Sequence, residues 1–176
     1  MQSIIFATLV FSFITAAPAE TAQPYAGHEQ RSLKALSDEE IADLRAGRGM
    51  GMALAAELNG YPGPLHVLEL ADELSLSLDQ RQEVEEIHAD MQAEASALGA
   101  LLIEQEAGLD RAFAERTVTP ASLSATLLEI GRLQAELRAT HLRHHLTTAA
   151  ALTPEQIAHY AALRGYASPH GQHGRH

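Results

Sequence analysis

The 176-residue chain contains no cysteine and no tryptophan, and aromatic residues make up only 5% of it. Without cysteine it cannot form disulfide bonds, use a thiol as a nucleophile, or build a Cys-based zinc or iron–sulfur site. Any metal site must therefore use His, Asp, Glu or Met. The abundance of Ala, Leu, Glu and Gln beside so few aromatic residues favours helices over strands, so the expected fold class is all-α.

Positive charge is also scarce. The chain has 12 Lys and Arg against 23 Asp and Glu, which gives a formal net charge of -11, and its single lysine is Lys34. Because phosphate binding needs clustered Lys and Arg, this composition argues against a nucleic-acid partner. The length allows one domain with a modest core.

Long apolar runs are confined to the N-terminus. The run "IIFATLVFSFITAAPA" (residues 4–19) is short for a membrane span and ends in small residues, and Ala17-Pro18-Ala19 fits a small-x-small cleavage site. We therefore predict a signal peptide over residues 1–19. No Lys or Arg precedes the run, so an uncleaved anchor is the alternative. The mature chain is expected to be soluble and exported, and periplasmic if the source is Gram-negative.

Capping signals and apolar spacing predict the helices. Ser37 and Glu40 form a capping-box pattern that starts a short helix, and Pro120 behind Thr119 is a favourable first helical residue. Apolar residues recurring every three or four positions indicate two long amphipathic helices. Helices are predicted over residues 38–46, 64–74, 78–116, 120–151 and 154–163, with about two further helical turns within 53–64.

The two long predicted helices are joined by a short turn around Val118, so we expect a long antiparallel hairpin with short flanking helices. In that register residue n lies roughly opposite residue 236 minus n. The second long helix carries two apolar stripes, one for its mate and one for a further helix or a second chain. The predicted organisation is a signal peptide (1–19), an N-terminal extension (20–63), a helical domain (64–165) and a histidine-rich tail (166–176).

Two boxes of the form L-[ST]-x-x-Q bracket the long helices: "LSLDQ" at residues 76–80 and "LTPEQ" at 152–156. Residues 64–165 resemble the Spy/CpxP superfamily of periplasmic helical proteins. The resemblance rests on these boxes and their spacing, together with the export signal and the absence of cysteine. The superfamily includes stress chaperones and heavy-metal sensors of the ZraP and CnrX type. The resemblance implies a four-helix protomer in an antiparallel, cradle-shaped homodimer without catalytic machinery, which either holds unfolded clients or binds metal through histidines.

The chain departs from that group in two respects. The client-binding chaperones carry a basic cradle, whereas the first long helix here has ten carboxylates against three arginines. Residues 31–63 match nothing in the group.

The sequence "THLRHHL" places three histidines within five positions of the second long helix. His141 and His145 are four residues apart and share one helix face, a spacing that can hold one metal ion. The expected register brings His88, Met91 and Glu94 toward this pair. Imidazole, thioether and carboxylate donors suit Zn, Ni, Co or Cu. In the resembled metal sensors an H-x-x-x-[HM] pair occupies the same kind of helix.

Plainer interpretations exist for the same histidines. A seam that turns polar near its open end often marks where a core meets water, and positive charge such as that of His144 is favoured near a helix C-terminus. The tail histidines, His170, His173 and His176, can capture metal loosely by wrapping, or can simply titrate near neutral pH.

The sequence contains no Ser/His/Asp set, phosphate loop or HExxH motif, so we expect no enzyme. The leading hypothesis is a periplasmic heavy-metal sensor or resistance accessory, and the resemblance implies that it forms a homodimer. The alternatives are an ATP-independent chaperone that holds unfolded clients and a regulatory partner of a membrane-bound envelope-stress sensor.

Overall fold

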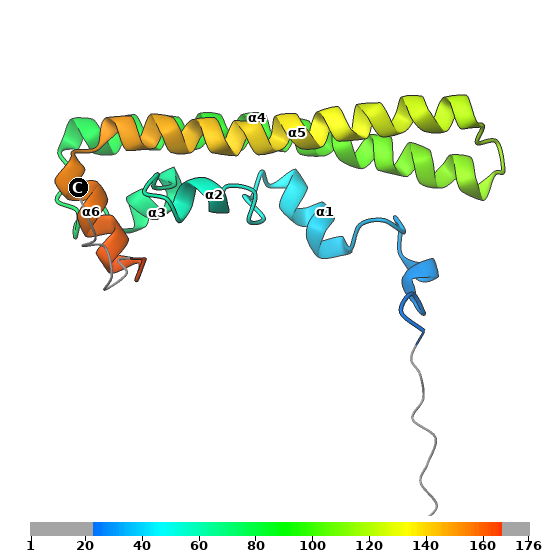
Figure 1. Cartoon of the computed structure of the whole chain (residues 1–176), viewed down its shortest axis with the longest axis horizontal. Coiled ribbons are helices and arrows are strands. Elements are labelled where there is room, and N and C mark those ends of the chain that lie inside the picture. The colour runs from blue at the N-terminus through cyan, green and yellow to red at the C-terminus, as the bar shows by residue number, and fades with distance from the viewer. Residues whose placement is uncertain (1–22, 167–176) are drawn as a thin grey trace, which may run out of the picture.

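The structure is a computed structural model that describes residues 23–166, and within that range it is mostly helical and has no β-strand. Two long helices dominate it, and short helices accompany them (Figure 1). The elements are η1 (His28–Gln30), α1 (Asp38–Arg45), α2 (Leu54–Glu57), α3 (Pro64–Glu69), α4 (Leu78–Ala114), α5 (Pro120–Ala151) and α6 (Pro154–Leu163). None of the helices in the described range is both long and apolar enough to cross a membrane.

The long helices α4 and α5 pack against each other, which confirms the prediction of two long packed helices. A capping box at Ser77 starts α4, and Thr119 with Pro120 starts α5. Figure 1 shows α5 running back along α4 after the turn. Between the two helices, Glu94 accepts hydrogen bonds from Thr140 and Arg143.

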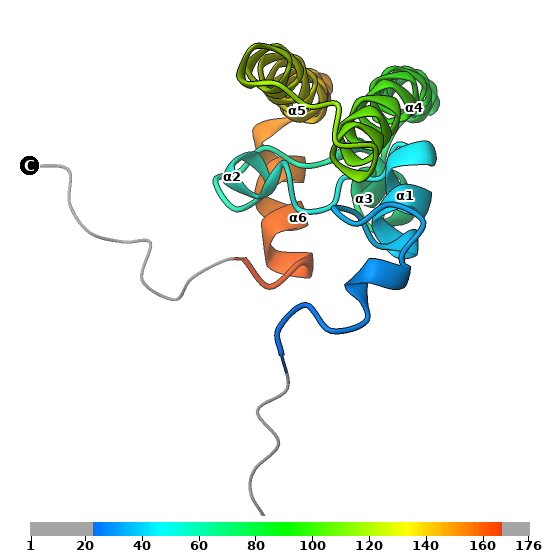
Figure 2. The same cartoon turned by 90° about the vertical axis from the view of Figure 1, so that its right-hand side faces the viewer.

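The short helices lie on one side of the α4–α5 pair (Figure 2). The chain from α1 to α3 follows the pair lengthwise, and α6 extends from the open end of the pair on the same side as these short helices (Figure 1). Residues 31–63, which match nothing in the resembled group, form much of this second layer. The prediction for α3 was wrong at its C-terminus: the helix ends at Glu69, and turns follow up to Ser75, whose φ of 51° redirects the chain toward α4.

The N-terminal layer approaches α4 closely at one glycine. A Cβ on Gly99 would lie 2.3 Å from the backbone oxygen of Leu44, so only glycine lets α1 pack this near. Nearby, the Ser96 hydroxyl donates to the carbonyl of Arg45 at 2.6 Å.

The apolar core consists of two clusters at different levels of the helix pair. One cluster joins α1, α4 and α5 and contains Leu44, Ala95, Leu102, Ile130, Leu133 and Leu137. The other lies at the open end and contains Val67, Leu74, Val84, Leu152 and Tyr160. Along α5 between Leu137 and Leu152, the buried residues are polar: Thr140, His141, His145 and Thr148. The buried face of α5 is therefore interrupted by a polar layer.

The two L-[ST]-x-x-Q boxes meet in the structure. Gln80 and Gln156 exchange amide hydrogen bonds of 2.9 and 3.1 Å. Gln80 also donates to the carbonyl of Ala151, and Gln156 donates to the carbonyl of Leu74. Each glutamine also closes its own capping box. The boxes therefore do more than cap helices, because they tie the start of α4 to the start of α6.

Of the two apolar stripes predicted on α5, one is buried and the other is largely exposed in the single chain. Leu128 is 76% exposed and Leu146 is 55% exposed. The second stripe therefore has no covering helix within the described residues.

Candidate functional site

The polar layer of α5 places two imidazoles inside the protein. His141 is 1% exposed and His145 is 8% exposed, and both lie where the chain before α3 crosses the helix pair. Buried polar side chains are normally hydrogen-bonded, because an unmet donor or acceptor retains its desolvation penalty. The partners of these two rings therefore decide what the layer can do.

His145 is held in one tautomer. Its Nδ1 lies 2.8 Å from the carbonyl oxygen of Tyr61. A carbonyl oxygen can only accept, so Nδ1 carries the proton, and Nε2 of the neutral ring keeps a free lone pair. The ring is oriented further by Glu57, whose Oε2 lies 3.7 Å from Nδ1, and by Gly63, where a Cβ would approach Nε2 to 3.0 Å. This is how proteins commonly orient a metal-binding histidine.

His141 lacks such a partner. Among the described residues, its Nε2 is the one buried side-chain nitrogen or oxygen without a hydrogen bond. Burial first, and then the neighbouring imidazoles of His145 and His144, lower the pKa of His141 below its ordinary value. The ring is therefore neutral at pH 7, and its Nε2 is left without a hydrogen-bond partner.

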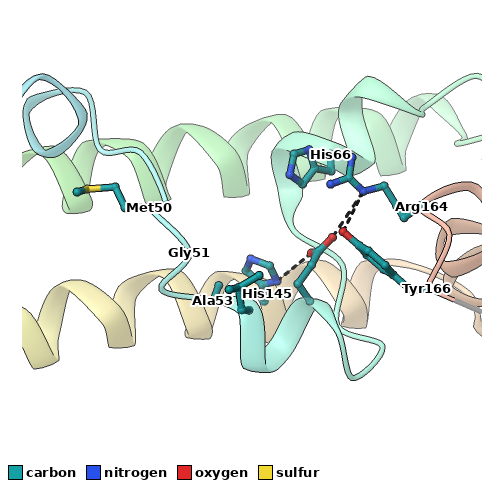
Figure 3. Close-up of a pocket in the computed structure, with 10 residues that line it drawn as sticks. Met50, Gly51, Ala53, His66, His145, Arg164 and Tyr166 are labelled. Atoms are coloured by element: carbon teal, nitrogen blue, oxygen red, sulfur yellow. Dashed lines mark hydrogen bonds and ion pairs between the residues drawn. The ribbon is translucent and has the colours of Figure 1, made fainter. Parts of the chain in front are cut away.

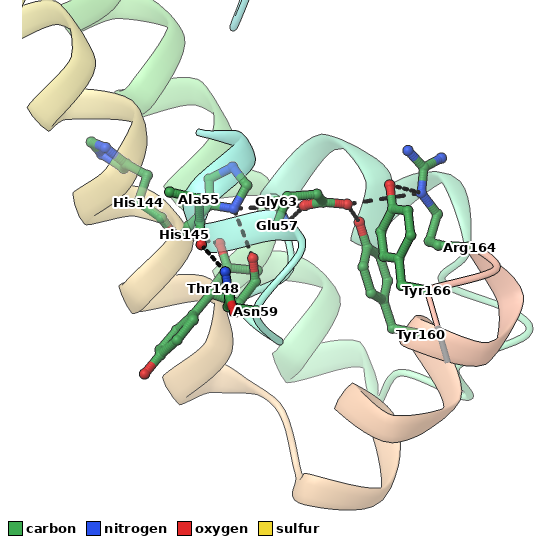
Figure 4. Close-up of polar contacts among 11 residues, drawn as sticks. Ala55, Glu57, Asn59, Gly63, His144, His145, Thr148, Tyr160, Arg164 and Tyr166 are labelled. Carbon is green, nitrogen blue, oxygen red and sulfur yellow. Dashed lines mark hydrogen bonds and ion pairs between the residues drawn. The ribbon is translucent and has the colours of Figure 1, made fainter. Parts of the chain in front are cut away.

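Behind His145 a buried carboxylate connects three parts of the chain (Figure 4). Glu57 of α2 accepts a short hydrogen bond from the Tyr160 hydroxyl of α6 and a 3.0 Å bond from the Gly63 amide. Arg164 Nε lies 3.8 Å from the same carboxylate. Burial, and then the bond to Glu57, raise the pKa of Tyr160, so its hydroxyl remains a donor. Glu57 therefore connects the chain segment that holds His145 to Tyr160 of α6.

Two cavities border the imidazoles. The smaller one, of about 120 Å³, is lined by His141, His145, His66 and Met91. Small and apolar residues of the segment that crosses the helix pair complete its lining. A larger one, of about 290 Å³, lies over His145 and includes Met50, His66 and Arg164 among its lining residues (Figure 3). His145 and His66 line both cavities.

The structure brings some of the predicted site residues together and leaves others elsewhere. Met91 joins His141 and His145 at the smaller cavity. His144 is half-buried, and its Nδ1 donates to the Thr140 carbonyl at 2.8 Å. Glu94 is exposed and pairs with Arg143. His88 is half-buried and lines neither cavity. His170, His173 and His176 lie outside the described residues, as does the expected signal peptide.

Sequence reasoning missed the residues that surround the pair from the N-terminal layer. Glu57 was the detectable one, because a lone carboxylate within the apolar stretch "ALAAEL" is a candidate for a buried, paired group. Tyr61 contributes its backbone carbonyl to His145, and Gly63 leaves room for the His145 ring. Neither contribution can be recognised from a pattern of side chains in the sequence. His66 also borders both cavities.

The donor set suits a metal ion only in part. Within residues 23–166, no three His, Cys, Asp or Glu side chains are placed together so as to hold one. The smaller cavity instead combines two imidazoles with a thioether. Such donors suit borderline or soft transition metals, with remaining positions taken by water or another ligand.

Comparisons with known proteins find no counterpart: no family model, curated protein or solved structure matches the chain.

Proposed function

We propose that the chain is an exported protein that binds a divalent transition metal through His141 and His145 and serves as a periplasmic heavy-metal sensor or resistance accessory. The observation that carries the proposal is the pair of buried imidazoles: one is fixed with a free Nε2, and the other has a buried Nε2 without a partner. Met91 is the nearest candidate for a third donor, since it lines the same cavity. The resemblance to the Spy/CpxP superfamily is compatible with this function, because that superfamily includes heavy-metal sensors as well as chaperones.

The proposal is tested by titrating the full chain with Zn(II), Ni(II), Co(II) and Cu(II). All variants carry alanine at the three tail histidines, so that tail binding does not mask the cavity. We expect His141→Ala/His145→Ala to abolish the tightest site, and Met91→Leu to weaken it mainly for the softer ions. The matched control is His88→Ala/His159→Ala, which removes two imidazoles that line neither cavity.

Unchanged affinity in the His141/His145 double variant would remove the site. Binding should also weaken below neutral pH, because imidazole must be neutral to coordinate. Binding that is insensitive to pH between about 5.5 and 7.5, one unit either side of the ordinary histidine pKa of about 6.5, would contradict imidazole ligation.

A second function, chaperoning of unfolded clients, is favoured by a different observation. Large apolar side chains are exposed along the long helices, including Leu101, Phe113, Leu127, Leu128 and Leu146. We propose that this surface contacts either a second copy in a homodimer or unfolded clients, since exposed apolar patches mark interaction sites. Suppression of a denatured client's aggregation in a chelator, lost in Leu128→Ser/Leu146→Ser, would support it. Measurement of molar mass in solution separates the homodimer from a client-binding monomer.

A further inference from the structure

A third cavity lies away from the histidines, between the N-terminal layer and the α4–α5 pair. It measures about 270 Å³, and its wall is formed by six leucine and methionine side chains, with Gln134 and Arg138 as the two polar residues. The apolar wall includes Leu44, Leu102 and Leu137 of the core cluster. Met50 and Met52 complete the side nearest the crossing chain. A pocket of this kind, apolar with a few polar groups on one side, is the usual form of a small-ligand site.

The polar side of the cavity carries positive charge. Arg138 is exposed and forms no ion pair or hydrogen bond within residues 23–166, whereas Arg48, Arg132 and Arg143 of the same chain each pair with a carboxylate. Gln134 precedes Arg138 by one helical turn, so both side chains lie on one face of α5. A guanidinium binds a carboxylate through two parallel hydrogen bonds, and the neighbouring amide can donate a third.

We infer that this cavity binds a small amphipathic anion, namely an aliphatic monocarboxylate whose chain enters the leucine–methionine wall and whose head is held by Arg138 and Gln134. Size fits the inference. At about 30 Å³ for each water-sized group, the cavity holds roughly nine non-hydrogen atoms, which corresponds to a medium-length chain. Methionine suits such a wall, because its flexible thioether adapts to ligands of different shape. The inference is independent of the metal site, and Met91 does not line this cavity.

The test uses the full chain with methyl-labelled methionine, followed by NMR during titration with octanoate, which has about ten non-hydrogen atoms. We expect the Met50 and Met52 methyl resonances to shift while that of Met91 stays in place. Arg138→Gln should weaken octanoate binding roughly tenfold, because a charge-assisted pair is lost. Arg111→Gln is the matched control, since Arg111 is also exposed and without an ion pair within residues 23–166 but does not line the cavity. Leu36→Phe, which partly fills the cavity, should also weaken binding.

Octylamine and butanoate separate the two parts of the interaction. The cationic amine should bind at least tenfold more weakly than octanoate, because Arg138 repels it. Butanoate should bind more weakly because it buries less apolar surface. Absence of octanoate-induced shifts at Met50 and Met52, equal binding by octylamine, or unchanged affinity in Arg138→Gln would each overturn the inference.

Discussion

Replacing His141 by leucine should make the metal-free protein more stable. The Nε2 of His141 is buried without a hydrogen bond, and the side chain is 1% exposed. An unmet buried polar group costs about 1–3 kcal/mol, and leucine removes it while keeping the site apolar and filled. The change of shape offsets part of that gain, by up to ~1.5 kcal/mol. We therefore expect His141→Leu to raise the free energy of unfolding by about 1 kcal/mol at pH 7.

The gain should grow as the pH falls. Burial lowers the pKa of His141 in the folded state, so the unfolded chain binds a proton first. The wild type is therefore destabilised as the pH falls below the ordinary histidine value of about 6.5, until the lowered pKa is reached. The leucine variant lacks this proton, so the stability difference between the two proteins should widen by at most ~1.4 kcal/mol for each pH unit in that window.

Urea unfolding followed by circular dichroism measures the effect, first in chelator and then with metal in excess. Metal at about one hundred times its dissociation constant should stabilise the wild type by ~2.7 kcal/mol and leave the leucine variant unchanged, so the order of stability should reverse. His159→Leu, an exposed change on α6, is the control and should alter little. A loss of more than about 1 kcal/mol in His141→Leu without metal would refute the reasoning, because it would show that the imidazole is well satisfied in the folded state.

Three further predictions concern the frame around the site. Gln80→Ala and Gln156→Ala should each lower the free energy of unfolding by about 1–3 kcal/mol. Because the two amides bond to each other, a double-mutant cycle in urea should give a coupling energy of ~1 kcal/mol. Strict additivity would contradict the pairing. Gly99→Ala should destabilise the fold by about 1–3 kcal/mol, because the added Cβ would meet the backbone of Leu44. Gly131→Ala has open space around it and should stabilise by up to ~1 kcal/mol. Equal shifts of the melting temperature in the two variants would rule out the close approach of α1 to α4 at Gly99. Tyr160→Phe removes the donor to a buried carboxylate and should lower stability by about 2 kcal/mol in chemical unfolding, while a change under about 0.5 kcal/mol would mean that the hydroxyl contributes no net stability.

The starts of α1, α4, α5 and α6 were predictable because each carries a local capping signal. Ser37, Ser77, Thr119 and Thr153 all cap the helices that follow them, and each forms a capping box. The packing of the two long helices followed from their apolar spacing. The end of α3 was predicted too late, because the apolar residues after Glu69 pack into the open-end cluster as turns rather than as helix.

The site was only half predictable for a related reason. Spacing along α5 identified His141 and His145, since residues on one helix have fixed relative positions. Their partners come from a chain segment without periodicity, whose path depends on tertiary packing such as the contact of Gly99 with α1. The facing helix therefore supplied Met91 but not Glu94, and the remaining neighbours came from residues 49–66.

The N-terminal layer is also what makes these imidazoles unusual. Tyr61 and Gly63 contact His145 from outside the α4–α5 pair, and Gly49 lies beside the His141 ring. On the two long helices alone, this face of α5 would meet water, which would satisfy both rings. The N-terminal layer excludes that water and leaves the Nε2 of His141 without a partner. A leucine at position 141 would instead continue the apolar seam from Leu137 to Leu152. In the proposed function a bound metal accounts for a polar residue at this buried position. The segment that matches nothing in the resembled family would then contribute much of the candidate site.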